Sequence, residues 1–206
     1  MALNATEVRI LGCLVEKEKT TPESYPLTTN ALVNACNQKT NRDPVMNLIE
    51  HDVSSTLQNL RDKGLVETTR AANERVYKHK HKLGGALDVS GKGLAVLAVL
   101  MLRGKQTPGE LRTRTERYVH FADLDEVEMM LGRLAELEPP LVKNYGRGPG
   151  QSQDRWGQLL GRDEEKQRPR ARPNAEQRSE LQELRDEVAE LREKLERVYE
   201  HLGLEP

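Results

Sequence analysis

The chain has 206 residues, of which 32% are charged, 36% are hydrophobic and 3% are aromatic, and its formal net charge is −1. This length fits one or two domains with small aliphatic cores. The nearly neutral balance excludes the large basic excess of a protein that coats nucleic acid without sequence preference.

The sequence predicts a cytoplasmic protein with no membrane partner. Its N-terminal residues lack the basic region and apolar run of a secretory signal, and no apolar stretch approaches the roughly 20 residues that cross a bilayer. The two cysteines, Cys13 and Cys36, lie beside apolar neighbours within expected helices. This position favours buried, reduced thiols.

Residues 1–83 predict three helices followed by a hairpin. The first helix begins at Asn4, and Glu7 follows three residues later, which is the spacing of a capping box. Apolar residues then recur at helical intervals and predict one buried face. They are Val8, Leu11 and either Leu14 or Val15. A second helix is expected from about Thr28, with Leu32, Val33 and Cys36 facing inward.

The polar residues 37–47 predict a loop that is longer than the usual connection of roughly 2–8 residues between helices. The third helix is expected over 50–63, where Val53, Leu57 and Leu60 share one face and Gly64 provides a left-handed stop. Residues 65–68 and 75–78 predict the two strands of the hairpin.

Residues 84–160 repeat this order. Ser90 is expected to cap a helix over 94–101, and Thr107 with Glu110 has a second capping-box spacing. A third helix is expected over 123–138, followed by short strands at 141–142 and 155–156. Helix, helix, helix, hairpin is the order of a winged helix. The prediction is therefore a tandem winged-helix protein that is mainly α with small β-hairpins, an α+β fold.

Residues 161–175 predict a basic, proline-containing linker, and residues 176–203 predict a coiled-coil helix. Apolar residues recur there at spacings of three and four. They are Leu181, Leu184, Val188, Leu191, Leu195, Val198 and Leu202. An isolated helix of this length is marginally stable in water. We therefore expect the seam to pair two copies in a homodimer, and folding back onto the winged helices is the alternative.

Three stretches are similar to a known family. Residues 3–17 read LNATEVRILGCLVEK, residues 103–112 read RGKQTPGELR, and the third stretch spans residues 24–45. They resemble the YceH-like family, bacterial proteins of unknown function with a tandem winged-helix fold. The resemblance covers both predicted winged helices. It implies the fold and a cytoplasmic setting, but no activity and no catalytic residue.

The third helix and the hairpin of the first unit predict a DNA-binding surface, because in this class of fold the helix enters the major groove. Gln and Arg read base edges, and serines bond phosphates. Residues 50–63 carry a net charge of −1, whereas residues 70–82 carry +4. A charged hairpin that is simply solvated is the alternative interpretation. The predicted contacts are Lys39, Arg42, Ser54, Ser55, Gln58, Arg61, Arg75, Lys78 and Lys80.

The second unit favours a different partner. Residues 123–138 carry a net charge of −5, which opposes the approach of a DNA duplex. A protein–protein scaffold without DNA binding is therefore the alternative function, with Glu126, Glu128 and Arg133 as its partner contacts. The second unit also has a basic region that leaves an unconventional basic face open. Its residues are Arg103, Lys105, Arg112, Arg114 and Arg117.

No motif predicts an enzyme, a cofactor or a metal. Residues 91–93 lack the glycine spacing of a phosphate loop, and residues 146–150 lack its strand-to-helix context. His79 and His81 share a strand face without a neighbouring cysteine or carboxylate at ligand spacing. The leading hypothesis is a non-enzymatic, dimeric transcription regulator or nucleoid-associated factor whose partner is double-stranded DNA.

Overall fold

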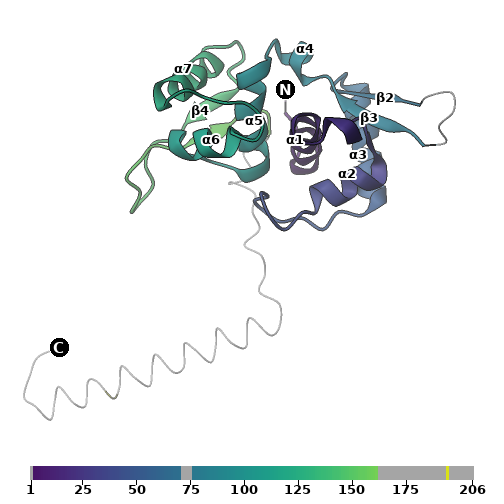
Figure 1. The fold of residues 1–206 in the computed structure, drawn as a ribbon. Coiled ribbons are helices and arrows are strands. Elements are labelled where there is room, and N and C mark those ends of the chain that lie inside the picture. Colours follow the sequence, from purple (N-terminus) through teal and green to yellow (C-terminus); the bar gives the residue numbers. More distant parts are fainter. Residues whose placement is uncertain (1, 71–75, 162–193, 195–206) are drawn as a thin grey trace, which may run out of the picture. The chain divides into compact units, whose positions relative to one another are not determined.

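The computed structural model describes residues 2–70, 76–161 and 194, and Figure 1 shows the course of the chain. The chain divides into two units, and the described ranges 2–70 and 76–161 lie in the first, Met1–Glu164, which is compact. In the described residues, α-helices combine with two small antiparallel sheets, so the fold class is α+β as predicted. None of the described helices is both long and apolar enough to cross a membrane.

Three helices begin the first unit. They are α1 (Ala5–Thr20), α2 (Thr29–Cys36) and α3 (Glu50–Asp62), with a 3-10 turn η1 (Pro22–Ser24) after α1. The capping box predicted at Asn4 is present. The Asn4 side chain accepts from the Glu7 N–H at 2.8 Å, and the Glu7 carboxylate accepts from the Asn4 N–H at 2.9 Å. After α3, Gly64 takes a φ of +71°, the left-handed conformation that favours glycine.

The first sheet contains three short strands. They are β1 (Leu27–Thr28), β2 (Val66–Thr69) and β3 (Lys78–His81), in the order β1-β3-β2. Strand β3 begins three residues later than the strand predicted at 75–78. Its register with β2 pairs Val66 with His81 and Thr69 with Lys78. Val76 and Tyr77, which the sequence placed in the strand, are each 54% exposed.

A buried histidine explains the observed register of β3. His79 lies in the middle strand, opposite Leu27 of β1 and Thr68 of β2. Its imidazole contacts the Thr29 hydroxyl at 3.1 Å and the Thr68 hydroxyl at 2.9 Å. Buried polar groups are stabilised by such hydrogen bonds. The register that places His79 between β1 and β2 therefore lets its imidazole be buried with a partner on each side.

The second half repeats the order of elements. They are α4 (Leu83–Leu87), α5 (Gly91–Arg103), α6 (Pro108–Thr115), α7 (Leu124–Ala135), β4 (Val142–Asn144) and β5 (Trp156–Gln158). The capping box predicted at Thr107 and Glu110 is present, with hydrogen bonds of 3.2 and 2.9 Å. Ser90 stands at the N-cap of α5, but its side chain makes no capping hydrogen bond. The sequence did not predict α4, which is only five residues long.

Helix α1 lies between α5 on one side and α2 with α3 on the other (Figure 1). Every residue from Glu7 to Glu16 is buried, whereas the periodicity predicted one apolar face. Gly12 permits the close approach to α5, because a Cβ there would lie 3.0 Å from the Leu102 side chain. The two predicted winged-helix units, 1–83 and 84–160, therefore share one core within the first compact unit.

Both cysteines are buried, and neither forms a disulfide. Cys13 lies in α1 and Cys36 ends α2. The predicted burial is thus confirmed. Apart from Lys194, the predicted coiled-coil helix lies outside the described residues, and so does most of the linker.

Candidate nucleic-acid interface

Helix α3 turns its polar residues outward and its apolar residues into the core, as predicted. Val53, Leu57 and Leu60 are buried on the inner face. The exposed residues that were predicted to contact DNA are Ser54, Ser55, Gln58 and Arg61. The outer face therefore presents hydroxyl, amide and guanidinium groups, which suit hydrogen bonds to base edges and phosphates.

Local hydrogen bonds hold three of these side chains along the helix, and the first is that of Ser55, which donates to the Asp52 carbonyl at 3.1 Å. The Arg61 guanidinium donates to Gln58 Oε1, and the Gln58 amide donates to Asp62 Oδ1 at 2.8 Å. These contacts are exposed, so a nucleic acid can replace them at a small net cost. Arg61 and Asp62 both bond to the Gln58 side chain, so their opposite charges largely cancel. The outer face of α3 therefore offers hydrogen bonds but little electrostatic attraction for phosphate.

The hairpin of β2 and β3 packs beside α3 and carries basic side chains. Lys80 lies 3.1 Å from Glu67, directly across the strand pair. The Arg70 guanidinium lies over the Tyr77 ring, 5.1 Å from its centroid, which is a cation–π distance. Lys78 is half-buried at the start of β3. Arg75, also predicted to contact DNA, lies outside the described residues.

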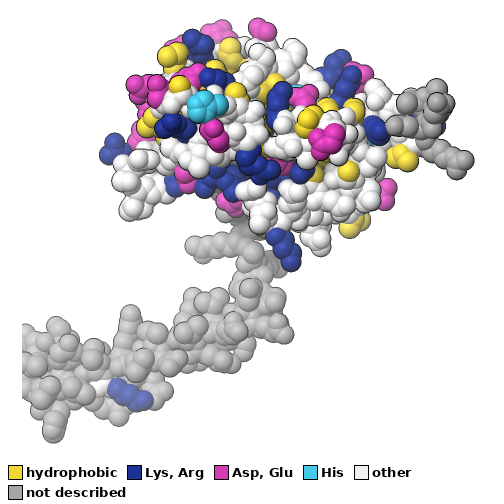
Figure 2. All heavy atoms as spheres, in the orientation of Figure 1, with side chains coloured by type: hydrophobic (Ala, Val, Ile, Leu, Met, Phe, Trp, Pro, Cys, Tyr) yellow, Lys and Arg dark blue, Asp and Glu magenta, His cyan; other side chains and the backbone are white. Residues whose placement is uncertain are grey.

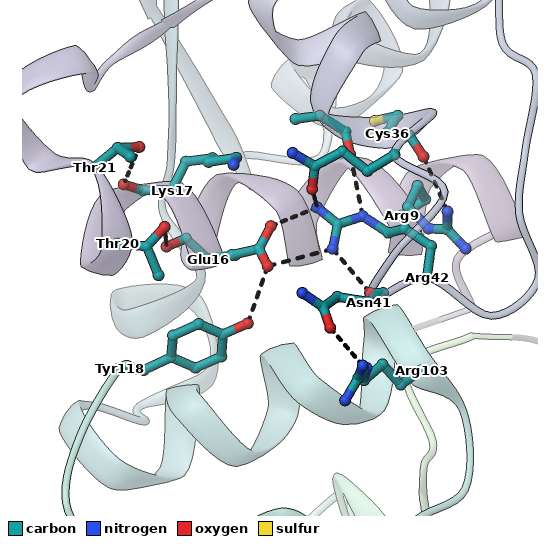
Figure 3. A network of polar contacts seen from close by, with 12 residues as sticks. Arg9, Glu16, Lys17, Thr20, Thr21, Cys36, Asn41, Arg42, Arg103 and Tyr118 are labelled. Carbon is teal, nitrogen blue, oxygen red and sulfur yellow. Dashed lines mark hydrogen bonds and ion pairs between the residues drawn. The ribbon is translucent and has the colours of Figure 1, made fainter. Parts of the chain in front are cut away.

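Arg42, which was predicted to contact DNA, is instead buried. Its side chain is 0% exposed and forms an ion pair with Glu16 of α1, whose side chain is 1% exposed. Figure 3 shows the guanidinium facing that carboxylate. Arg42 also donates to the Ala35 carbonyl at 3.0 Å and to Gln38 Oε1 at 2.8 Å. Local sequence gave no sign of this pair, because its two members stand 26 residues apart.

The hydroxyl of Tyr118 completes the arrangement around Glu16. It donates to Glu16 Oε1 at 3.2 Å from the turn that follows α6. Burial, followed by the neighbouring Glu16 carboxylate, raises the pKa of Tyr118, so the hydroxyl keeps its proton and remains a donor. Glu16 thereby connects α1, the segment 37–47 and the second half of the unit.

Hydrogen bonds join the two ends of the segment 37–47 to each other and fix the segment to the core. The Asn37 side chain accepts from the Leu48 N–H and donates to the Leu48 carbonyl, both at 2.8 Å. Arg9 donates to the Pro44 carbonyl at 2.6 Å. The Asp43 N–H donates to the Leu102 carbonyl of α5 at 2.8 Å. Of the two DNA contacts predicted in this segment, Lys39 is the one that is exposed.

His79 and His81, the two histidines of one predicted strand, both lie in β3. The His79 ring is engaged by threonines, and His81 Nε2 lies 3.4 Å from Glu18 Oε2. Burial lowers the pKa of both imidazoles, which favours their neutral form. In residues 2–70 and 76–161, no three His, Cys, Asp or Glu side chains are grouped to hold a metal ion.

Helix α7 contains the contacts of the predicted scaffold. Glu126 pairs with Lys92 of α5 and accepts from the Ala122 N–H at 2.9 Å. The hydrogen bond from Lys92 is the main reason that the pKa of Glu126 is lowered. Glu128 is exposed. Arg133 is also exposed, and it donates to the sulfur of Met129 at 3.6 Å. Glu126 therefore has a structural role within the unit, whereas Glu128 and Arg133 face solvent.

The predicted dimer seam, which runs from Leu181 to Leu202, lies outside the described residues. The other candidate contacts belong to the compact unit Met1–Glu164.

The family described as "Protein of unknown function, DUF480" matches residues 3–151. The chain belongs to this family. The UPF0502 protein YceH of Salmonella newport (strain SL254) is 42% identical over 210 residues, which cover 98% of each chain. This match confirms the predicted YceH-like resemblance.

Two further relatives match a shorter part of the chain. The UPF0502 protein of Geobacter sulfurreducens is 54% identical over 158 residues, covering 77% of this chain and 72% of its own. The UPF0502 protein of Geotalea uraniireducens is 52% identical over 160 residues, covering 78% of this chain and 73% of its own. Their names identify a family and no activity.

Proposed function

We propose that this protein is a non-enzymatic, tandem winged-helix protein that binds double-stranded DNA and acts as a transcription regulator or nucleoid-associated factor. The first unit contacts the duplex through α3 and the hairpin of β2 and β3. The C-terminal seam pairs two copies. The observation that carries the proposal is the exposed polar face of α3 beside a hairpin with basic side chains.

The winged-helix interpretation is supported by strand pairing in both halves. In a winged helix, a short extended segment between the first two helices adds to the hairpin. In the first half, β1 pairs with β3 through Leu27 and His79. In the second half, Gln106 lies between α5 and α6 and exchanges backbone hydrogen bonds of 2.9 and 2.8 Å with Trp156 of β5. The two halves thus follow one plan.

The DNA interpretation is supported by the different side chains of α3 and of the β2–β3 hairpin. The major groove of B-DNA admits an α-helix, whose amide and guanidinium side chains distinguish base pairs. The hairpin supplies the attraction for phosphate that α3 lacks, because it carries Arg70, Lys78 and Lys80 against Glu67, which pairs with Lys80. Tyr77 is exposed beside Arg70 and is available to pack against a sugar or a base.

The test is fluorescence anisotropy of a labelled mixed-sequence duplex with the full-length protein. Binding measured at about 50 and about 200 mM salt gives the dependence of affinity on salt, whose log–log slope changes by about 0.9 for each phosphate contact. The double variant Lys78→Ala/Lys80→Ala is expected to weaken binding and to reduce that slope by about 1 to 2. Arg133→Ala removes a charge from α7 and is the matched control.

Two results would contradict the proposal. Absence of binding at the lower salt concentration removes DNA as the partner. Binding with the same slope in the hairpin variant and in the control means that DNA is held by another surface, and the assignment of α3 and the hairpin then fails.

A second candidate function is a protein–protein scaffold that uses α7, and exposed apolar side chains favour it. Met129 is 55% exposed and Leu124 is 38% exposed, on a helix that also carries Glu128. Because Glu126 is engaged with Lys92, Glu128→Lys is the better charge reversal. We expect Glu128→Lys to abolish recovery of a co-purifying protein while duplex affinity stays the same or rises. Equal recovery with both chains would remove the scaffold as a candidate.

A further inference from the structure

A pocket lined by residues of both halves is explained neither by the family match nor by the proposed DNA surface. It lies where α5 and α6 meet the segment that follows α2, and its volume is about 190 Å³. Its polar lining consists of Asn41, Arg103, Thr113, Arg114, Arg117 and Tyr118. In Figure 2, dark blue Lys and Arg side chains gather below the centre of the compact unit, in the area where Figure 1 draws α6 and that segment.

The pocket wall combines three guanidinium groups with no carboxylate. Arg103 donates to the neutral side chain of Asn41. Arg114 forms an ion pair of 3.2 Å with Glu110, and the same carboxylate also pairs with Arg155 at 3.1 Å. Arg117 is exposed at the pocket. The positive charge of the lining therefore exceeds the negative charge that contacts it.

The pKa of Arg103 agrees with this imbalance. Burial is the main cause that lowers its pKa, and repulsion from Arg114 is the next. Like charges held together in a partly desolvated site repel each other, and an anion placed between them relieves that repulsion.

The wall formed by the segment 37–47 is held in position before any ligand arrives. Asn41 has a φ of 60°, a left-handed conformation that is uncommon for residues other than glycine. Its neighbours hold it there, since Arg42 is locked to Glu16 and the Asp43 N–H is bonded to the Leu102 carbonyl. The Asn41 side chain thus faces Arg103 without further ordering, which lowers the entropic cost of binding.

We propose that this pocket binds the phosphate group of a small molecule. Guanidinium groups match the oxygens of a phosphate with paired, charge-assisted hydrogen bonds. The Asn41 amide provides an additional polar group, whereas the Thr113 hydroxyl donates to the Gly109 carbonyl at 3.1 Å. Sites for drug-sized ligands measure about 300–1,000 Å³. A pocket of about 190 Å³ therefore suits one phosphate group with a small substituent.

Binding has a structural consequence. The ligand contacts Asn41 on the segment from the first half and the arginines of α5 and α6 from the second half. A ligand that binds the folded state alone stabilises it in proportion to the logarithm of its concentration. The bound phosphate group therefore stabilises the packing of the two halves against each other, and this effect does not depend on DNA binding.

The test is isothermal titration calorimetry of the full-length protein with inorganic phosphate in a buffer free of phosphate and sulfate. At a phosphate concentration ten times the measured Kd, Tm is expected to rise by about 3–6 °C. Arg117→Gln and Arg114→Gln are each expected to weaken binding at least about tenfold, since each removes a charged hydrogen-bond donor. Arg133→Gln removes the same charge outside the pocket and is expected to keep the Kd unchanged.

The ¹H–¹⁵N signals of the arginine side chains provide a readout that does not rest on affinity. The Arg103 signal is expected to shift on addition of phosphate, and a duplex oligonucleotide is expected not to reverse this shift. Circular dichroism confirms that each variant is folded before titration.

Each outcome decides the proposal. Phosphate binding that is weakened in the pocket variants and unchanged in Arg133→Gln supports it. No binding at millimolar phosphate, or equal binding in all variants, overturns it. Competition between duplex and phosphate also overturns it, because the arginines would then belong to a nucleic-acid surface and not to a small-molecule site.

Discussion

Removing one member of the buried ion pair between Glu16 and Arg42 is predicted to destabilise the compact unit strongly, because the other charge is left buried without its partner. Arg42→Met keeps a long side chain but removes the charge and its hydrogen bonds. The Glu16 carboxylate then remains buried, with the Tyr118 hydroxyl as its side-chain donor among the described residues. Removing one member of a buried pair costs about 3–5 kcal/mol.

That loss sets the size of the expected effect. For a protein of this size, about 3–5 kcal/mol corresponds to a fall in Tm of about 6–20 °C. The double variant Glu16→Gln/Arg42→Met no longer carries a buried unpaired charge. Its loss is therefore expected to be smaller than the sum of the two single losses by about 2 kcal/mol or more, since contacting residues couple.

Urea unfolding followed by far-ultraviolet circular dichroism measures the free energy of unfolding of the four proteins. A loss below about 1 kcal/mol for Arg42→Met would refute the reasoning, because exposed pairs contribute at that level. Additive single losses would refute the coupling. In the folded variant, the salt slope of duplex binding is expected to match that of the unsubstituted protein, since the pair lies inside the unit.

Three further predictions follow from packing, burial and the tail. Gly12→Val is expected to lower the free energy of unfolding by about 1–3 kcal/mol, since its added atoms meet Leu102 of α5. Gly132→Ala, whose added Cβ would have nothing within 4 Å, is expected to raise it by about 0.4–1 kcal/mol. The same urea assay measures both. Burial lowers the pKa of His79, so unfolding takes up protons. The free energy of unfolding is therefore expected to fall as the pH drops from about 6.5 through the lower folded pKa, and to fall less in His79→Gln; a rise would contradict this. Truncation after Arg172 is expected to give monomers in sedimentation velocity, and a persistent dimer would remove the C-terminal seam as the dimer contact.

The candidate interface was partly accessible from the sequence. The exposed polar face of α3 follows from the spacing of Val53, Leu57 and Leu60, because a helix repeats every 3.6 residues. The position of Arg42 did not follow, because a polar loop residue looks the same whether its partner is water or a buried carboxylate. The phosphate pocket was visible only as a cluster of arginines. Its wall at Asn41 comes from a segment 62 residues away from Arg103.

The sequence by itself determined the features that depend on neighbours within a few positions. The capping boxes at Asn4 and Thr107, the stop at Gly64 and the inner face of α3 are of this kind, since their hydrogen bonds and contacts close within one helical turn.

The tertiary structure alone decided the register of β3, the burial of α1 on both sides and the pairing of Arg42 with Glu16. Each depends on which distant surface packs against the segment: β1 against His79, α5 against Gly12, and α1 against the segment 37–47. Burial in a shared core changes the free energy of a charged or polar side chain far more than local propensity does. Packing therefore sets the role of these residues.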